Sequence, residues 1–253
     1  MQHIDKLVRR HFDALAQSYD EKANNRSAYL QTADEEIISL VTRTARRRPV
    51  ILDIGTGTGK RLQGLAARLP DTTLYACDVS PEMVRIARAN GLRRVKVATL
   101  TDLPYNDEQF DYVFSLFFVF GYLSTEQERT TALREISRVL KPGGMVVIDV
   151  INRWHTGDGH GYSKRRRTIV SELIQGRVKH KLEWGDVMFN LDIDASSVPG
   201  YFHTFTDKEA NKLFRNAGFS IESHKVIGYG SGTTQAKLHQ GNFLYVLKKR
   251  SEK

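Results

Sequence analysis

A glycine-rich turn after the first apolar run of the chain carries the clearest sign of chemistry. Residues 50–54 are apolar apart from Asp53, and Asp53-Ile54-Gly55-Thr56-Gly57-Thr58-Gly59 leads away from them. Glycine lets a backbone turn sharply and approach a ligand closely. A glycine turn between a strand and a helix is typical of a nucleotide-type site at the carboxyl edge of a sheet.

Neighbouring residues narrow the kind of nucleotide site. A hydride-transfer enzyme would have a third glycine at the position of Lys60, and a phosphate-binding loop would have Ser or Thr at the position of Arg61. A diphosphate-binding site is therefore disfavoured. Asp78 closes the next apolar run, where a carboxylate can accept hydrogen bonds from both hydroxyls of a ribose, each worth about 1.5–3 kcal/mol. The alternative for Asp78 is a cap on the helix that begins at Pro81.

Short apolar runs alternate with amphipathic segments over residues 50–150. We expect strands near 50–54, 73–77, 94–98, 110–116 and 145–150. A capping box of Ser124 and Gln127 opens a helix with a buried stripe, and Pro142-Gly143-Gly144 ends it. This alternation predicts a mostly parallel sheet covered by helices on both faces.

The flanking segments complete the expected organisation. Helices are predicted at 4–19 and 28–44, a hairpin within 168–184, a helix from Thr206 to Gly218 with a Thr206–Glu209 capping box, and closing strands at 219–227 and 242–249. We expect a single domain over residues 1–253. Its parts are a helical lid (1–45), a cofactor-binding core (50–150), a substrate-side insertion (151–205) and a closing segment (206–253).

The order of these parts resembles the class I S-adenosylmethionine-dependent methyltransferases of the type 11/25-like domain. The segments that carry the resemblance are 50–59, 74–87, 102–113, 135–147 and 206–219, within a stretch of about residues 10–249. The resemblance implies an α/β, doubly wound, Rossmann-like fold with a seven-stranded sheet whose last strand is antiparallel. It also implies an N-terminal helical lid and an insertion after the fifth strand.

The resemblance further implies S-adenosyl-L-methionine as the cofactor and a role for each matching residue. Gly55 and Gly57 let the backbone pass the methionine part, and Asp53 anchors the loop and faces the cofactor amino group. Asp78 holds the ribose hydroxyls. The other implied contacts are Val79 and Met83 beside the adenine, Thr99 and Leu100 bordering it, and Ser115 or Leu116 at the methionine end.

Two features qualify these roles. Many relatives carry Asp where Thr99 stands, which leaves the backbone N–H of Leu100 to meet the adenine. The Phe12-Asp13 and Tyr19-Asp20 pairs resemble a family stretch that folds over the site, which implies that Tyr19 touches cofactor or substrate. An aromatic ring beside a sulfonium is favourable, although both rings can equally be the buried face of a lid helix.

No residue is marked by its spacing as a catalytic base. Alignment of acceptor, methyl and sulfur supplies most of the catalysis, and a base is needed only where the acceptor must lose a proton. The candidates are His155, His160, His203, Tyr122 and Tyr201. We expect no metal, because His155, Asp158 and His160 lie in a glycine-rich loop without regular ligand spacing.

The methyl acceptor has two leading interpretations. The first is a small molecule that is methylated on N or O. Aromatic and apolar residues of the insertion would form the wall of its pocket, or would simply form a hairpin core. These residues are Trp154, Tyr162, Trp184, Met188 and Phe189. Residues 123–135, and more loosely 201–205, resemble the wobble-uridine-modifying tRNA methyltransferases. A protein methyltransferase and a cofactor-binding protein without catalysis are less favoured.

Charge bears on the same choice. The net charge is +9, and residues 151–190 hold eight Lys or Arg against four acids. An anionic partner such as tRNA would suit this excess, whereas Lys164-Arg165-Arg166-Arg167 can also protect an exposed strand edge. We favour the small molecule.

Composition sets the remaining bounds. A chain of 253 residues with 40% hydrophobic and 26% charged residues is globular rather than disordered. One cysteine excludes an internal disulfide and a cysteine-type zinc site. The longest apolar run, 112–120, is too short to span a bilayer, and residues 1–12 do not form a secretory signal, so we expect a cytoplasmic protein.

Overall fold

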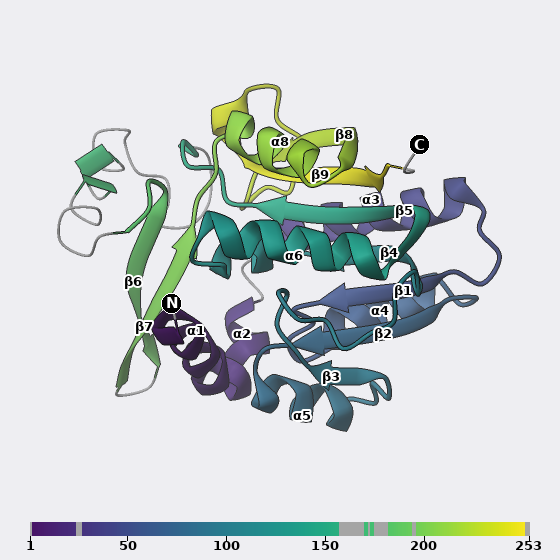
Figure 1. Ribbon diagram of the computed structural model, residues 1–253. Coiled ribbons are helices and arrows are strands. Elements are labelled where there is room, and N and C mark those ends of the chain that lie inside the picture. The colour runs from purple at the N-terminus through teal and green to yellow at the C-terminus, as the bar shows by residue number, and fades with distance from the viewer. Residues whose placement is uncertain are drawn as a thin grey trace.

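A seven-stranded sheet runs through the centre of the molecule, in the order β3-β2-β1-β4-β5-β9-β8 (Figure 1). The computed structural model describes residues 2–23, 27–156, 170–171, 173–174, 182–193 and 196–250. The strands of this sheet are β1 (Val50–Ile54), β2 (Thr73–Asp78), β3 (Val95–Val97), β4 (Phe110–Ser115), β5 (Leu140–Val150), β8 (Phe219–Ile227) and β9 (Asn242–Lys249). Strand β9 is antiparallel to β5 and β8, whereas β1 to β5 pair in parallel. The expected class I sheet is confirmed.

The reversal of strand order locates the site. From β1 the chain adds β2 and β3 on one side and then β4 and β5 on the other. The loops after β1 and β4 therefore diverge at the carboxyl edge, and such a point is where open α/β sheets bind ligands. Asp53 pairs with Phe114 and Ile54 with Ser115 in this register, so β1 and β4 end side by side.

Helices cover both faces of the sheet. Helices α3 (Ser27–Thr44), α4 (Lys60–Arg68) and α5 (Pro81–Ala89) bury Ile37, Leu62 and Val84 against one face. Helices α6 (Glu126–Val139) and α8 (Asp207–Asn216) bury Leu133 and Phe214 against the other. Within the described ranges, no helix is long and apolar enough to cross a membrane.

A separate layer lies beyond the carboxyl edge of the sheet (Figure 1). It contains α1 (Gln2–Leu15), a 3₁₀ turn (Ala16–Ser18), α2 (Tyr19–Ala23) and a hairpin of β6 (Asp186–Ile193) and β7 (Ser196–His203). Helix α1 packs against β7 and against α5. Two further 3₁₀ turns, Val119–Tyr122 and Leu238–Gln240, follow β4 and precede β9.

Two local predictions were wrong. The capping box of α6 is Thr125 with Glu128, one residue later than the Ser124–Gln127 box read from the sequence. The hairpin predicted within 168–184 lies later in the chain, at β6 and β7; residues 170, 171, 173 and 174 are helical, and the rest of 168–181 lies outside the described residues.

Candidate active site

The loop after β1 accommodates only glycine at its closest approach. Gly55 and Gly57 have φ angles of +72° and +58°, where residues with a side chain are strained. A Cβ on Gly55 would lie 2.3 Å from a methyl carbon of Val119, and one on Gly57 would lie 3.4 Å from the Tyr19 ring. The N–H of Gly55 donates to the carbonyl oxygen of Cys77 at 2.8 Å, which ties the loop to β2.

Asp78 is held rigidly at the end of β2. Its Oδ2 accepts the N–H of Gly57 at 2.8 Å and its Oδ1 accepts the N–H of Ser80 at 2.9 Å. Burial raises the pKa of Asp78 to about 6, against the lowering effect of these two donors. The cap of α5 is Ser80, whose hydroxyl accepts the N–H of Met83 at 3.0 Å. Asp78 is therefore not the helix cap, and both of its oxygens keep a lone pair for a ligand.

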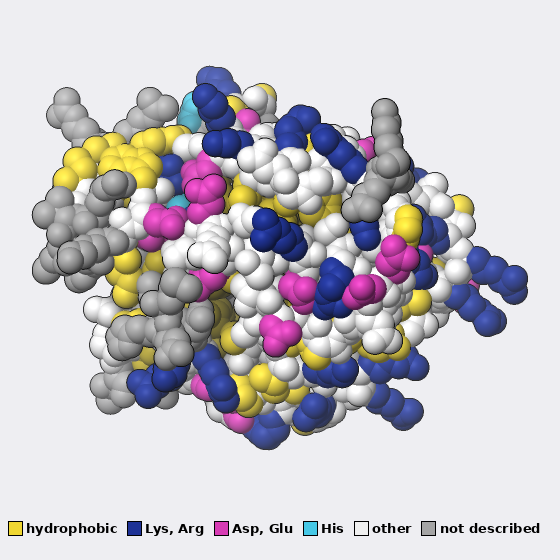
Figure 2. Space-filling model, viewed as in Figure 1, with side chains coloured by type: hydrophobic (Ala, Val, Ile, Leu, Met, Phe, Trp, Pro, Cys, Tyr) yellow, Lys and Arg dark blue, Asp and Glu magenta, His cyan; other side chains and the backbone are white. Residues whose placement is uncertain are grey.

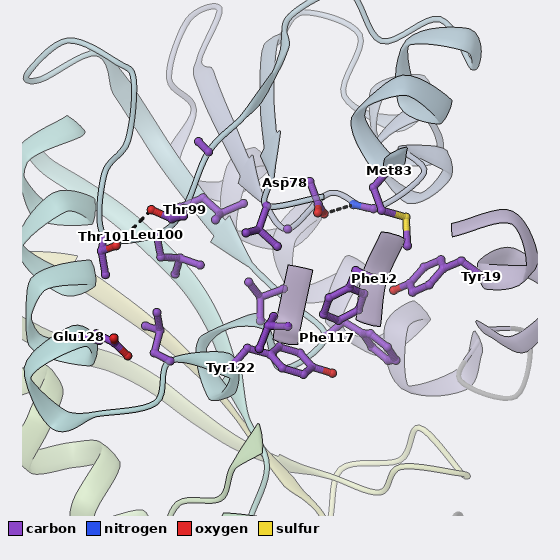
Figure 3. A pocket seen from close by; sticks show the side chains of 18 residues that line it. Phe12, Tyr19, Asp78, Met83, Thr99, Leu100, Thr101, Phe117, Tyr122 and Glu128 are labelled. Atoms are coloured by element: carbon purple, nitrogen blue, oxygen red, sulfur yellow. Dashed lines mark hydrogen bonds between the residues drawn. The ribbon is translucent and has the colours of Figure 1, made fainter. Parts of the chain in front are cut away.

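A cavity of about 100 Å³, here called the central cavity, opens beside Asp78 (Figure 3). Side chains from the loops after β2, β3 and β4 and from the N-terminal helices surround it. Its lining residues are Val8, Phe12, Tyr19, Ile54, Gly55, Gly57, Asp78, Val79, Met83, Ala98, Thr99, Leu100, Thr101, Phe117, Val119, Tyr122, Leu123 and Glu128. Most of this lining is apolar, as ligand sites generally are.

The N-terminal helices form a lid that hydrogen bonds hold to the starts of α4 and α5. Asp13 accepts a hydrogen bond from the Ser80 hydroxyl at 2.5 Å, at the start of α5. Asp20 accepts one from the Thr58 hydroxyl at 2.7 Å and pairs with Lys60 at 2.8 Å, at the start of α4. Between these attachments, Phe12 and Tyr19 enter the lining of the central cavity from one side, at the right in Figure 3.

The loop after β4 has an uncommon backbone. Phe117 and Phe118 both have left-handed φ angles, +69° and +65°, which is rare for residues other than glycine. Asp149 of β5 accepts their two N–H groups at 3.0 and 2.7 Å, and it also accepts the Tyr29 hydroxyl at 3.0 Å. Burial raises the pKa of Asp149 to about 6. These bonds hold the loop that carries Phe117 and Val119 into the central cavity.

A second cavity, of about 380 Å³, adjoins the first. The two share Tyr19, Gly55 and Phe117. The other residues that line the second cavity are Asp20, Glu21, Leu30, Thr56, Thr58, Lys60, Arg61 and Leu116. Two buried atoms of this lining, Oγ1 of Thr56 and Nη2 of Arg61, have no hydrogen-bond partner among the described residues. Both atoms are enclosed by protein, although the residues that carry them line the second cavity.

The structure brings most of the cofactor residues implied by the resemblance to one place. Those that line the central cavity are Tyr19, Gly55, Gly57, Asp78, Val79, Met83, Thr99 and Leu100, and Leu116 lines the second cavity. Asp53 and Ser115 line neither. The Oδ1 atom of Asp53 is bonded to Nη1 of Arg61 at 3.0 Å, and Ser115 is fully buried at the end of β4.

Of the residues considered as a catalytic base, Tyr122 lines the central cavity. His203 lies elsewhere, with Nδ1 2.6 Å from Asp186 and Nε2 2.9 Å from Glu209. Tyr201 donates its hydroxyl to the same Asp186 at 2.6 Å, and His155 is buried away from both cavities. His160 lies outside the described residues. His203 and Tyr201 therefore have structural partners that fix the hairpin.

The insertion does not wall the central cavity as we expected. Trp154, Trp184, Met188 and Phe189 are absent from its lining, and Tyr162 lies outside the described residues. Phe189 instead packs on the ring of His11 in α1, with ring centres 5.5 Å apart. The hairpin thus supports the lid from outside.

Sequence reasoning missed several lining residues, including Thr101, Phe117, Val119 and Glu128. The predicted contacts at the end of β4 stopped at Ser115 and Leu116, and no pattern in the sequence indicates that the residues after them enter the cavity. Arg61 was used only to exclude a phosphate loop. It is the second residue of α4, and its contact with Asp53 is seen in the structure and is not marked by any pattern in the sequence.

Comparison with known proteins agrees with this geometry. Residues 52–148, from β1 to β5, match the family described as a methyltransferase domain. A crystal structure of an S-adenosylmethionine-dependent methyltransferase from Methanosarcina mazei superposes with a TM-score of 0.66 at 20% identity, covering 84% of this chain and 98% of that one. A Burkholderia thailandensis 1,6-didemethyltoxoflavin N1-methyltransferase, solved with its substrate and S-adenosylhomocysteine, gives a TM-score of 0.61 at 16% identity, covering 96% of this chain and 87% of that one.

The fold is that of the class I S-adenosylmethionine-dependent methyltransferases, and the chain contains a methyltransferase domain, whose cofactor is S-adenosylmethionine. Within the chain, the methyltransferase domain occupies residues 52–148. Sequence comparison also finds a tRNA (carboxymethyluridine(34)-5-O)-methyltransferase of Arabidopsis thaliana, 43% identical over 101 residues. That match covers 40% of this chain and 24% of the plant protein, so it concerns a shared core.

Proposed function

We propose that the protein transfers the methyl group of S-adenosylmethionine to a nitrogen or oxygen atom of a small molecule. The observation that carries this proposal is the lining of the central cavity. Its described lining residues include the acids Asp78 and Glu128 but no Lys or Arg, and the lid residues Phe12 and Tyr19 lie over it. A largely apolar site suits a compact organic acceptor better than a phosphate-rich one.

The residues present fit the cofactor. Asp78 has two free lone pairs for the ribose hydroxyls, and the glycines at 55 and 57 leave room where any side chain would meet Val119 or Tyr19. Val79 and Met83 on one side and Leu100 on the other offer apolar contact to a flat base. When bound, S-adenosylmethionine supplies a methyl group activated by its positive sulfur.

The protein's own contribution is to position and to exclude water. Phe117 and Tyr122 face the cavity opposite Asp78 (Figure 3), and Asp149 fixes the first of these through the backbone. Restricting the acceptor to an in-line approach can lower the barrier by up to roughly 7–11 kcal/mol. For a hydroxyl acceptor, Tyr122 is the candidate base that lies in the cavity.

A tRNA acceptor is the second candidate. The match to the plant tRNA methyltransferase and the net charge of +9 favour it. On the face shown in Figure 2, however, Lys and Arg are dispersed and are mixed with Asp and Glu over α6. The run at 164–167 lies outside the described residues.

Two measurements test the proposal. Calorimetry with S-adenosylhomocysteine tests the site: the wild type binds, and Asp78→Ala binds at least 10-fold more weakly, because charged hydrogen bonds to the ribose are lost. Unchanged affinity in Asp78→Ala would refute the assigned role.

Methyl transfer from labelled cofactor is then compared between a panel of small amines and phenols and bulk tRNA, at 50 and 200 mM salt. We expect transfer to a small molecule that salt changes little. Transfer to tRNA alone, with binding that weakens steeply over this salt range, would support the second candidate instead.

A further inference from the structure

Six exposed arginines lie on α1, on α5 and on the segment that leads from α5 into β3. They are here called the arginine strip: Arg9, Arg10, Arg85, Arg88, Arg93 and Arg94. Helix α1 and residues 79–97 together hold eight Lys or Arg against three Asp or Glu. This local excess is more than half of the net charge of +9. The positive charge of the protein is therefore concentrated on one part of its surface.

The two helical parts of the arginine strip are joined by polar contacts. Helix α1 packs against α5. Arg9 pairs with Asp13 at 3.9 Å, and Asp13 also accepts the N–H of Glu82 at 3.4 Å. Gln17 donates to the Glu82 carboxylate at 2.8 Å, and Arg85 donates to it twice, at 2.7 and 2.9 Å. The strip is thus continuous across the boundary between the lid and α5, along the lower side of the molecule in Figures 1 and 2.

The other arginines of the strip extend it towards the edge of the sheet. Arg88 Nη2 donates to the carbonyl oxygen of Val95 at 3.0 Å, which holds the guanidinium beside β3. The guanidinium carbon of Arg94 lies 5.4 Å from the centre of the Tyr75 ring. Arg10 and Arg93 have no ion-pair partner among the residues that the structure describes. Since a guanidinium carries five N–H donors, every member of the strip retains donors for an external anion.

The chemistry of the arginine strip fits a phosphate backbone better than an acidic protein. Arginine matches phosphate oxygens with two parallel N–H bonds. Interfaces between proteins are centred on aromatic and apolar side chains, whereas interfaces with nucleic acids are polar and strongly positive. Of the large apolar side chains exposed in the described part of the chain, only Val97 lies beside the strip.

We propose that the arginine strip binds the phosphate backbone of a nucleic acid. The inference goes beyond the proposed function and does not depend on it, because none of the six arginines lines either cavity. Helices α1 and α5 contribute Phe12 and Met83 to the central cavity. A backbone bound to the strip therefore runs along the outside of the same helices that enclose the cofactor site.

The test compares two double variants that remove the same charge from the full chain. Arg10→Gln/Arg93→Gln removes the two members of the strip that have no described ion-pair partner. Arg47→Gln/Arg215→Gln is the matched control, because both of these arginines are exposed, Arg47 precedes β1 and Arg215 lies in α8 against the opposite edge of the sheet. Fluorescence anisotropy with labelled bulk tRNA measures the affinity of each protein between 50 and 200 mM salt.

We expect Arg10→Gln/Arg93→Gln to bind tRNA roughly 5-fold or more weakly at 50 mM salt. The slope of log affinity against log salt should fall in magnitude by about 2, because two phosphate contacts are lost. The control should change the affinity by less than about twofold. Equal weakening in both double variants would show that only the net charge matters, and it would overturn the proposal. A wild type that does not bind tRNA at 50 mM salt would overturn it as well.

Polyglutamate distinguishes a nucleic acid from an acidic protein, because it carries carboxylates in place of phosphates. We expect it to displace tRNA less effectively at equal charge concentration, and equal displacement would overturn the assignment to a nucleic acid. Both double variants should bind S-adenosylhomocysteine as the wild type does, and loss of that affinity in Arg10→Gln/Arg93→Gln would contradict a surface separate from the cofactor site. A protein that binds tRNA through the strip but methylates no small molecule would contradict only the proposed function.

Discussion

Asp149 at the carboxyl end of β5 accepts the backbone N–H of Phe118, 2.7 Å away in the loop after β4. The neighbouring N–H of Phe117 donates to the other carboxylate oxygen at 3.0 Å. Both residues have left-handed φ angles, and their adjacent N–H groups donate to the same carboxylate. A side chain of the sheet therefore holds the loop after β4 in a conformation that the Phe residues would otherwise avoid.

We predict that Asp149→Asn lowers the free energy of unfolding by about 1–3 kcal/mol at pH 7. An amide has one acceptor oxygen and one donor group, so it leaves one of the two loop N–H groups unsatisfied. Affinity for S-adenosylhomocysteine should fall as well, because Phe117 lines both cavities. Chemical denaturation and calorimetry give the two quantities.

Tyr29→Phe is the matched control for this variant. It removes the third hydrogen bond of Asp149 but leaves both loop N–H groups paired. We expect lower stability with nearly normal cofactor affinity. If the two variants lose affinity to the same degree, the loop is not what Asp149 stabilises.

Gly55→Ala tests the closest contact of the glycine loop. The new Cβ would lie 2.3 Å from Val119 at a φ of +72°. We predict a loss of about 2–5 kcal/mol of stability from backbone strain and overpacking together. Adding Val119→Ala should recover part of that loss, and strictly additive effects in denaturation would show that Val119 is not the obstacle.

The sequence predicted those parts of the site that local chemistry determines. Glycines at 55 and 57 are demanded by the left-handed φ of the turn, and Asp78 follows from its place at the end of a parallel strand. The Thr206–Glu209 capping box was found at the correct residues. These features depend on neighbours a few positions apart, which a sequence displays directly.

Features that depend on distant contacts were missed. Asp149 lies more than 30 residues from Phe117, and nothing in either segment indicates that they meet. The ion pair between Asp53 and Arg61 was also missed, because Arg61 is oriented by Asp34 of α3 and this contact is not visible in the sequence. At α6, both Ser124 and Thr125 are residue types that cap helices. Which of them is the cap depends on the residue at which the helix begins, and this is not visible in the sequence.

Opening of the lid should depend on Asp13. Asp13→Ala removes the hydrogen bond that the Ser80 hydroxyl donates, which links α1 to the start of α5. We predict that S-adenosylhomocysteine dissociates roughly 2- to 10-fold faster, in line with about 0.5–1.5 kcal/mol for one hydrogen bond. Stopped-flow fluorescence measures the rate. Glu35→Ala, which breaks an exposed ion pair with Arg68, should leave it unchanged, and an equal acceleration there would count against the lid.

His203 should behave as a structural residue. It lies between Asp186 and Glu209, at 2.6 and 2.9 Å, and joins β6, β7 and α8. We predict that His203→Ala lowers stability by about 3–5 kcal/mol, because a buried partner of charged groups is lost. At temperatures where the variant is folded, its affinity for S-adenosylhomocysteine should be normal. The control is His239→Ala, at an exposed position. If His203→Ala lost turnover without losing stability, His203 would again be a candidate catalytic base.

Cofactor affinity should depend on pH through Asp78. Its pKa in the free protein is raised to about 6 by burial, and hydroxyl donors of a ribose bind the ionised form. Affinity for S-adenosylhomocysteine should therefore fall about 10-fold from pH 7.5 to pH 5. The folded protein holds a proton on Asp78 that the unfolded chain releases near pH 4, so this group's contribution makes the unligated protein less stable as pH rises from about 4 to 6. Asp149 has a similar pKa, so the comparison must include Asp78→Asn, in which both pH dependences should become weaker. Calorimetry across pH 5–8 and denaturation across pH 4–8 measure them, and unchanged pH dependences in Asp78→Asn would assign them to Asp149 instead.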